Sequence, residues 1–157
     1  MTGSEVIRVE DLRVALPDRG RKTLLAPAPL VEIVKGVSLA INRGETVGIV
    51  GESGAGKTTL GRTLVRLIEP SAGTLHFAGN DITHAHESDL RRLRPRMQMI
   101  FQSARSSLNP RRTIEDSVAA PAIAAGKGAR AITLARTALD RAGLPASYRA
   151  RYPHQLS

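Results

Sequence analysis

One short glycine-rich segment carries the residues with the clearest chemical use. Residues 51–58 read Gly-Glu-Ser-Gly-Ala-Gly-Lys-Thr, which is a glycine, four further residues and then the triplet Gly-Lys-Thr. Glycines let a loop curl with its backbone N–H groups turned inward around an anion, at backbone angles that a side chain would obstruct. A lysine after such a loop can bind β- and γ-phosphates, and the next hydroxyl can bind Mg²⁺. The segment therefore predicts a nucleoside triphosphate site.

The predicted site extends from the loop into the start of the following helix. We expect Lys57 to be catalytic as well as phosphate-binding, because its charge can neutralise the charge that develops during phosphoryl transfer. The hydroxyl of Thr58 is expected to be a ligand of Mg²⁺. The residues expected to bind ATP are Gly51, Glu52, Ser53, Gly54, Ala55, Gly56, Lys57, Thr58 and Thr59.

Two other interpretations of the same residues fit less well. A serine-hydrolase elbow centred on Ser53 requires a glycine where this chain has Ala55. A dinucleotide fingerprint that begins at Gly54 requires a third glycine where this chain has Thr59. The phosphate-binding interpretation is therefore favoured.

The segments around the loop predict the order strand, loop, helix. Residues 46–50 form an uncharged, largely apolar run, which is typical of a parallel strand covered on both faces, so we expect them at the centre of the domain. After the loop, leucines recur at helical spacing and predict a helix over residues 57–68, ended by Glu69-Pro70. The dipole of this helix would add to anion binding at its N-terminus.

Further strands are predicted on both sides of this unit. Residues 7–16 alternate apolar and polar side chains apart from one slip at Glu10-Asp11, which indicates a strand with a bulge. Residues 17–30 predict a loop, and residues 34–41 a strand that turns through 42–45 into 46–50 as a hairpin. Short strands are also expected around Leu75 and Phe77 and, buried, over residues 97–101.

The C-terminal part predicts helices. Residues 89–93 and 117–125 are expected to be helical, the second segment despite Pro121. A third helix has one apolar face formed by Ile132, Ala135, Leu139 and Ala142, and it is expected to stop at Gly143. We therefore expect α/β structure up to about residue 102 and a helical part after it.

Composition and charge exclude several classes of protein. The 157 residues are enough for one domain, no stretch approaches the 18 apolar residues of a membrane span, and the lack of cysteine excludes disulfide scaffolds. His84 and His86 lack further ligands at suitable spacing, so we expect them at a loop or helix start and not in a metal site.

The net charge of +9 is concentrated in the second half of the chain. Seven arginines and no acidic residue lie between positions 91 and 112. Aromatic residues are only 3%, and Phe101 is the only one among these arginines, which is too few to stack successive bases, so no nucleic-acid binding is expected. The arginines suit a solvated surface, or charge pairing at a protein or lipid surface.

Three stretches of the sequence resemble one known family. Residues 34–82, VKGVSLAINRGETVGIVGESGAGKTTLGRTLVRLIEPSAGTLHFAGNDI, are similar to the ATP-binding subunit of ABC transporters. Residues 97–114, MQMIFQSARSSLNPRRTI, narrow the resemblance to the ATPases of oligopeptide, dipeptide and nickel importers. Residues 151–157, RYPHQLS, resemble the segment that runs into the ABC signature Leu-Ser-Gly-Gly-Gln.

The resemblance implies an α/β fold, the P-loop NTPase fold of the ABC ATP-binding cassette, here incomplete, with an antiparallel β part and a helical subdomain. Residues 1–102 would form the N-terminal part of the ATPase core, and residues 103–157 the helical subdomain up to the signature. Gln102 corresponds to the Q-loop glutamine, which implies a catalytic role and contact with Mg²⁺ and the attacking water. The implied cofactors are ATP and Mg²⁺.

The same resemblance implies a function in transport, in which ATP binding and hydrolysis are coupled to the uptake of peptides or nickel. The implied partners are transmembrane permease subunits, a second ATP-binding cassette and, indirectly, a solute-binding protein. The implied location is cytoplasmic, peripheral on the inner face of the cell membrane. Two alternatives stay open, namely a stand-alone nucleotide-binding module without turnover and a soluble P-loop enzyme not linked to transport.

The sequence departs from the family pattern at three places. No aromatic residue precedes Phe77, so Leu16 is expected to replace the ring that stacks on adenine. Gln102 is followed by Ser103-Ala104 where the family usually has Asp-Pro. The rest of the signature, the Walker B strand and the switch histidine would lie beyond Ser157, so we expect a truncated chain that is inactive alone and that aggregates or binds ATP poorly.

Overall fold

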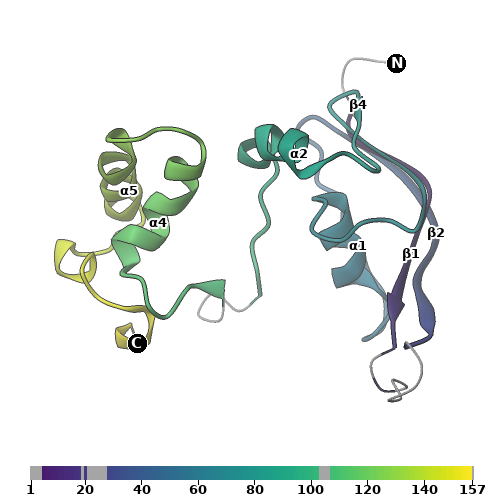
Figure 1. Cartoon of the computed structure of the whole chain (residues 1–157), viewed down its shortest axis with the longest axis horizontal. Helices are drawn as coiled ribbons and strands as arrows, with labels where there is room; N and C mark the ends of the chain where they lie inside the picture. Colours follow the sequence, from purple (N-terminus) through teal and green to yellow (C-terminus); the bar gives the residue numbers. More distant parts are fainter. Residues whose placement is uncertain (1–4, 19, 21–27, 103–106, 157) are drawn as a thin grey trace. The chain divides into compact units, whose positions relative to one another are not determined.

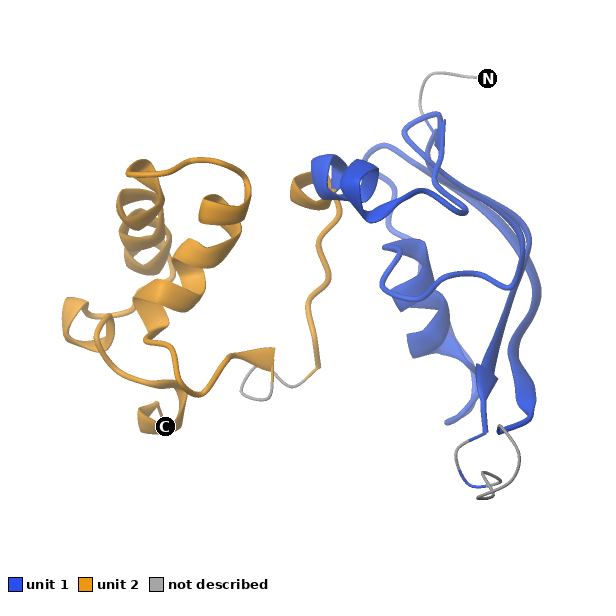
Figure 2. Cartoon of the chain, in the orientation of Figure 1, with its two compact units in different colours: residues 1–93 blue, residues 94–157 orange. Residues whose placement is uncertain are grey.

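The computed structural model describes residues 5–18, 20, 28–102 and 107–156. The chain divides into two compact units, residues 1–93 and residues 94–157 (Figure 2). The domain boundary expected at residue 102 stays a prediction. Among the described residues, no helix combines the length and the apolar character that crossing a bilayer demands.

Unit 1 is built on a four-stranded antiparallel sheet with the order β2-β1-β3-β4 (Figure 1). The strands are β1 (Glu5–Pro17), β2 (Leu30–Asn42), β3 (Ala72–Phe77) and β4 (Asn80–Asp81). Alternation along β1 and β3 turns one set of side chains into the core, which confirms the predicted pattern. The buried side chains of these two strands are Val9, Leu12, Val14, Leu75 and Phe77.

The bulge predicted in the first strand is present. The pairing of β1 with β2 shifts between Val9 and Leu12, and Asp11 has a positive φ of 45°. The backbone N–H of Asp11 donates a 2.9 Å hydrogen bond to the hydroxyl of Ser38 in β2. Because a bulge adds one residue, Val9 and Leu12 can both face the core although they are three positions apart.

The expected hairpin into residues 46–50 is wrong. The partner of β2 is β1, and within the described part of the chain residues 46–50 belong to no strand. Val50 is 97% exposed, and Val47 and Ile49 are also exposed. A strand exists only where neighbouring strands satisfy its backbone N–H and C=O groups, and no described segment pairs with this one. The apolar run therefore did not produce the expected central strand.

Helix α1 (Lys57–Leu64) follows the glycine-rich loop, as predicted, and buries Leu60 and Leu64 against the core. It ends four residues before the predicted end. Arg66 adopts a left-handed conformation with φ of 53°, its N–H bonds to the carbonyl of Thr63, and the N–H of Leu67 bonds to the carbonyl of Arg62. This pair of hydrogen bonds is a Schellman motif, which terminates the helix with an arginine where glycine is usual.

Unit 1 ends with helix α2 (Glu87–Leu93), which confirms the helix predicted over 89–93. The 3₁₀ turn η2 (Arg94–Arg96) follows at the start of unit 2. The buried strand expected over residues 97–101 is wrong, because this segment is irregular and Ile100 is 97% exposed. As for residues 46–50, apolar composition alone does not supply the strand partner that a ladder requires.

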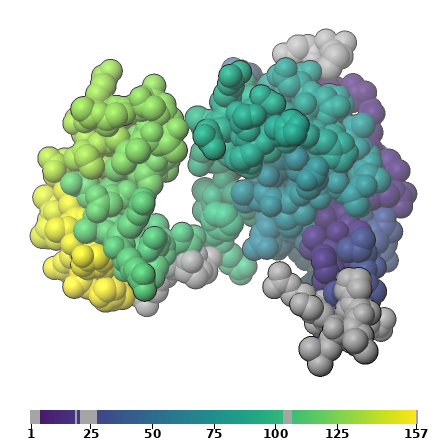
Figure 3. Space-filling view, in the orientation of Figure 1, coloured from purple at the N-terminus to yellow at the C-terminus, as the bar shows by residue number. Residues whose placement is uncertain are grey.

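Unit 2 contains a helical hairpin followed by two short turns (Figure 2). Figure 3 shows the surface of residues 107–156 in green to yellow. Its elements are α4 (Ile114–Ala124), α5 (Arg130–Arg141), η3 (Ala146–Tyr148) and η4 (Pro153–Gln155). Small side chains let the two helices approach closely, and Ala119, Ala131 and Ala135 form their core. Gly143, with φ of 73°, follows the end of α5 as predicted.

Candidate functional site

The glycine-rich loop links the irregular segment 46–50 to the first residue of α1. The backbone N–H of Ala55 donates a 3.2 Å hydrogen bond to the carbonyl of Glu52, which forms a tight turn. Gly54 and Gly56 both have a φ of 86°, a conformation that costs a residue with a side chain roughly 1–2 kcal/mol. The backbone angles at these two positions are therefore ones that favour glycine, as predicted.

Gly56 is required for a second reason, which is its contact with β2. A Cβ atom at this position would lie 2.8 Å from the carbonyl oxygen of Ile33, closer than real side chains approach a backbone atom. Nothing lies within 4 Å of the corresponding position at Gly54. The close approach at Gly56 fixes the end of the loop against the sheet, and this backing by Ile33 has no signal in the sequence.

The N-terminus of α1 is arranged to attract an anion. Gly56 is the N-cap and supplies no side-chain cap, and the first turn contains no acidic residue. The first backbone N–H groups of a helix have no partner inside the helix and form the positive end of its dipole. A phosphate at this position would therefore meet both hydrogen-bond donors and a favourable electric field.

The side chain of Lys57 folds back across the loop. Its ammonium nitrogen donates two hydrogen bonds of 2.6 Å, to the carbonyl oxygens of Gly51 and Glu52. The side chain is half-buried, whereas residues 51–55 are exposed. The structure thus places the predicted lysine directly against the loop that it is expected to serve.

The two threonines that follow lie in the first turn of α1. Thr58 is exposed, and Thr59 is half-buried. The carbonyl of Thr59 accepts a 2.9 Å hydrogen bond from the hydroxyl of Thr63 one turn later, which gives this buried hydroxyl a partner. Thr58 directly follows Lys57 and is exposed, so its hydroxyl can meet a ligand at the helix start.

A cavity of about 520 Å³ lies beside the loop and is formed entirely within unit 1. Its wall combines apolar side chains with the charged side chains of Glu32, Lys35 and Lys57, and it includes part of the glycine-rich loop. The apolar residues that line it are Ile33, Val34, Val37, Ile49, Val50 and Leu60. The part that β2 plays in this wall has no signal in the sequence, because the packing of β2 beneath the loop depends on tertiary structure.

Gln102 and the glycine-rich loop belong to different compact units. Gln102 is exposed, occupies a bend and belongs to unit 2, whereas the loop belongs to unit 1. The strand that was expected to lead into it is absent from residues 97–101 as described. Ser103-Ala104 fall outside the described residues. A contact of Gln102 with the phosphate site therefore stays a prediction.

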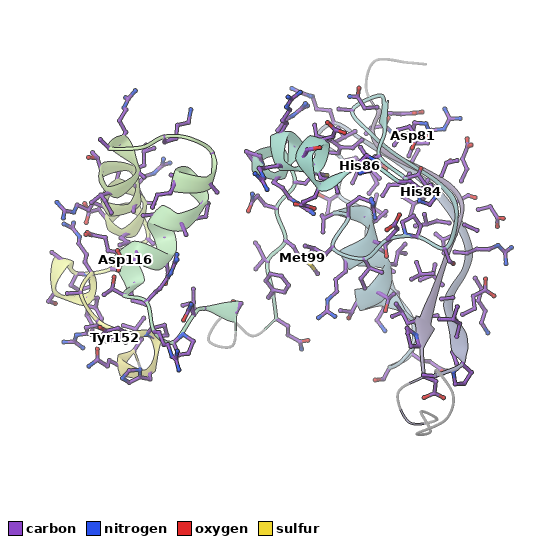
Figure 4. The ribbon with its side chains drawn as sticks, in the orientation of Figure 1. Asp81, His84, His86, Met99, Asp116 and Tyr152 are labelled. Atoms are coloured by element: carbon purple, nitrogen blue, oxygen red, sulfur yellow. The ribbon has the colours of Figure 1, made fainter. Side chains whose placement is uncertain are left out.

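His84 and His86, which precede α2, are labelled in Figure 4. The Nδ1 atom of His84 lies 2.9 Å from Oε1 of Glu69, and this contact, with a smaller effect of the Arg66 charge, lowers the pKa of Glu69. Helix α2 begins at Glu87, next to His86, as expected for a helix start. Among the residues that the structure describes, no three His, Cys, Asp or Glu side chains gather to hold a metal ion.

The sequence matches known proteins over most of its length. The family model described as "ABC transporter" matches residues 34–157. A Brucella ovis protein whose name describes a peptide import ATP-binding protein is 46% identical over 129 residues, 81% of this chain and 41% of that protein. The oligopeptide transport ATP-binding protein OppF of Lactococcus lactis is 40% identical over 159 residues, 98% of this chain and 49% of that protein. The chain thus spans less than half the length of these relatives.

The fold also matches solved structures. The dimeric post-hydrolysis structure of the ATP-binding cassette MJ0796, bound to ADP and phosphate, has a TM-score of 0.76 to this chain at 24% sequence identity. The match covers 96% of this chain and 63% of that one. This likeness confirms the predicted fold class, an α/β ATP-binding cassette fold with an antiparallel β part and helices.

Proposed function

Because the chain belongs to the ABC transporter family, we propose that residues 51–59 bind the phosphates of ATP in the ATP-binding subunit of an importer. The observation that carries the proposal is the arrangement of the loop end: Gly56 pinned against β2, an uncapped helix N-terminus and Lys57 folded over the loop. Two relatives whose names refer to peptide or oligopeptide transport favour peptides as the cargo, with nickel as the other candidate.

In this proposal the backbone makes the largest number of contacts with the nucleotide. The N–H groups of the loop and of the first turn of α1 donate to the phosphate oxygens, and the left-handed glycines keep the chain free of obstructing side chains. Lys57 exchanges its bonds to the carbonyls of Gly51 and Glu52 for bonds to phosphate oxygens. Its charge then stabilises the negative charge that grows as the γ-phosphoryl group is transferred.

The proposed ligands of Mg²⁺ are the hydroxyl of Thr58 and the side chain of Gln102. Magnesium prefers oxygen ligands and keeps several waters, so a site that offers neutral side-chain oxygens and receives phosphate oxygens suits it. The exposure of Thr58 at the start of α1 fits this requirement. When bound, the ion would supply positive charge that offsets the negative charge of the phosphates. Gln102 is proposed to orient the attacking water.

The proposed partners follow from the same family membership. A second cassette would complete the nucleotide site, and the dimeric form of MJ0796 supports this proposal. Permease subunits would receive the coupled motion, and a solute-binding protein would deliver the cargo to them. The proposed location is the cytoplasmic face of the cell membrane, where these partners meet.

The proposal is tested by uptake of a labelled oligopeptide in cells that carry the gene, with Lys57→Ala introduced on the chromosome. We expect uptake to be lost, because the lysine acts on the transferred phosphoryl group. Arg43→Ala, which removes an exposed cation from the turn after β2, is the matched control and should transport normally. Undiminished uptake by Lys57→Ala would overturn the proposed role.

A further inference from the structure

The net positive charge of the chain comes almost entirely from unit 2. Residues 94–157 contain eleven Lys and Arg and three Asp and Glu, so this unit carries +8 of the total charge of +9. Its three carboxylates are already bonded within the unit. The bonded pairs are Glu115 with Arg136, Asp116 with Thr113, and Asp140 with Arg149. The remaining cations therefore have few carboxylates to neutralise them.

Helix α5 concentrates part of this charge on one face. Arg130, Leu134, Thr137 and Arg141 are spaced as i, i+4, i+7 and i+11, so they lie along one side of the helix, and all are exposed. The opposite side is the buried one that contains Ala131, Ala135 and Leu139 and packs in unit 2. We call these four exposed residues the basic face of α5.

The basic face also carries apolar surface. Leu134 is 46% exposed between the two arginines. At the end of α4, Ile123 is 56% exposed, and the exposed Lys127 lies in the turn that leads into α5. Binding to a membrane surface grows with the apolar area that enters it and with electrostatic attraction to anionic lipids, and this part of unit 2 exposes both kinds of side chain.

We propose that the basic face of α5 binds anionic lipid headgroups directly, independently of a protein partner. Arg130 and Arg141 are roughly 16 Å apart along the helix axis, with an aliphatic side chain between them. A lipid surface can meet this pattern, because headgroups move to both cations while Leu134 enters the layer between them. The proposal does not depend on nucleotide binding, since the residues concerned all belong to unit 2.

Other anionic partners fit the face less well. A single-stranded nucleic acid would be expected to meet aromatic side chains for stacking, and α5 contains none. An acidic protein would need fixed carboxylates placed at the same separation and a surface that accepts Leu134 between them. A fluid anionic surface needs neither.

The experiment is flotation of the full chain with vesicles in a density gradient, without nucleotide, so that aggregated protein does not count as bound. Vesicles of phosphatidylcholine with about one quarter phosphatidylserine are compared with pure phosphatidylcholine. We expect binding to the anionic vesicles only. Because binding is largely electrostatic, it should weaken strongly between low salt and roughly 0.5 M salt.

Matched variants separate this face from the charge of the whole chain. Arg130→Gln with Arg141→Gln should weaken partitioning about 10- to 30-fold, since each cation near an anionic surface contributes roughly fivefold. Arg43→Gln with Arg62→Gln removes the same charge from exposed sites in unit 1 and should change it little. Leu134→Gln keeps the charge of the face. It should weaken the part of the binding that persists at high salt, which depends on apolar contact. Circular dichroism confirms that all variants remain folded.

Equal losses in the two double variants would overturn the proposal, because binding would then follow net charge alone. Failure to float with anionic vesicles would also overturn it. So would retention by duplex DNA or by an acidic polypeptide when anionic vesicles do not bind. Loss of ATP binding in Lys57→Ala with lipid binding unchanged would leave this proposal intact, since the two sites are independent.

Discussion

The ammonium nitrogen of Lys57 lies 2.6 Å from the carbonyl oxygen of Gly51, the glycine that opens the loop. A second bond of the same length reaches the carbonyl of Glu52. The first helical residue is thereby tied to the start of the loop, six positions earlier in the chain. The cation that is proposed to bind phosphate thus also holds the loop in a closed shape.

The two left-handed glycines of the loop should respond differently to alanine. Both Gly54→Ala and Gly56→Ala place a Cβ on a backbone with φ of 86°, which costs roughly 1–2 kcal/mol. Only at Gly56 would the Cβ also meet the carbonyl of Ile33 at 2.8 Å, and this should add about 1–3 kcal/mol. Urea unfolding of the two variants measures the difference, and equal free energies of unfolding would contradict the close approach.

Substitution of Arg66 should lower the free energy of unfolding more than substitution of any other charged residue of unit 1 outside the loop. The guanidinium of Arg66 is buried and donates a 2.8 Å hydrogen bond to the carbonyl of Ile82, which joins the end of α1 to the segment after β4. Arg66→Ala should lower the free energy of unfolding by about 2–3 kcal/mol, because a buried carbonyl loses its partner. Arg62→Ala, on the exposed side of α1, should cost less than about 0.5 kcal/mol.

A third variant at the same position separates the two roles of Arg66. Arg66→Gly also removes the guanidinium, but glycine tolerates the left-handed backbone at φ of 53°. The loss should therefore be smaller than for alanine by about 1 kcal/mol. Unfolding that is no easier in Arg66→Ala than in Arg62→Ala would contradict the assigned contact.

The free energy of unfolding at low pH should depend on Asp81, which is labelled in Figure 4. Its carboxylate accepts hydrogen bonds of 2.6 Å and 2.8 Å from the hydroxyl and the N–H of Thr83, which hold its pKa below the ordinary value of 3.8. The unfolded chain therefore takes up a proton first as the pH falls. This stabilisation is present above pH 3.8 and is lost as the pH drops through the lower pKa of the folded protein.

Asp81→Asn removes the titrating group and should make the fall in unfolding free energy between about pH 5 and about pH 2 less steep. Urea titrations at several pH values measure this slope, with Asp89→Asn in α2 as the matched control. An unchanged slope in Asp81→Asn would show that the bonds from Thr83 do not favour the charged carboxylate.

Local patterns predicted most of the elements whose partners lie within the described chain. The slip at Glu10-Asp11 indicated the bulge in β1, because only an added residue lets Val9 and Leu12 share one face. The periodicity of α5 likewise placed Ala135 and Leu139 on the buried side that packs on α4. The predicted face was only partly right, because Ile132 is half-buried, Ala142 is exposed after the helix end, and the buried Ala131 was not predicted.

The wrong predictions share a physical cause. Residues 46–50 and 97–101 have the composition of buried strands, but composition indicates what a segment favours and not which strand will pair with it. The early end of α1 had no signal either, since an arginine at φ of 53° is held there by its bond to Ile82 and not by local preference.

The sequence predicted those parts of the candidate site whose contacts join residues close together in the chain. Spacing identified the loop, its glycines and Lys57, because all their contacts with one another lie within a few residues. The backing of Gly56 by Ile33 was not predictable, since it depends on how β2 packs beneath the loop. The part assigned to Gln102 rests on the family pattern and stays a proposal.

The central claim is that the loop and the start of α1 bind the phosphates of ATP, and an NMR titration of the ¹⁵N-labelled chain with MgATP tests it most directly. This method detects weak binding and reports each backbone amide separately. We predict shifts concentrated at residues 51–59 with ATP, none with adenosine, and about 10- to 100-fold weaker binding in Lys57→Ala. Unmoved loop amides at saturating ATP, or the same affinity in Lys57→Ala, would contradict the account.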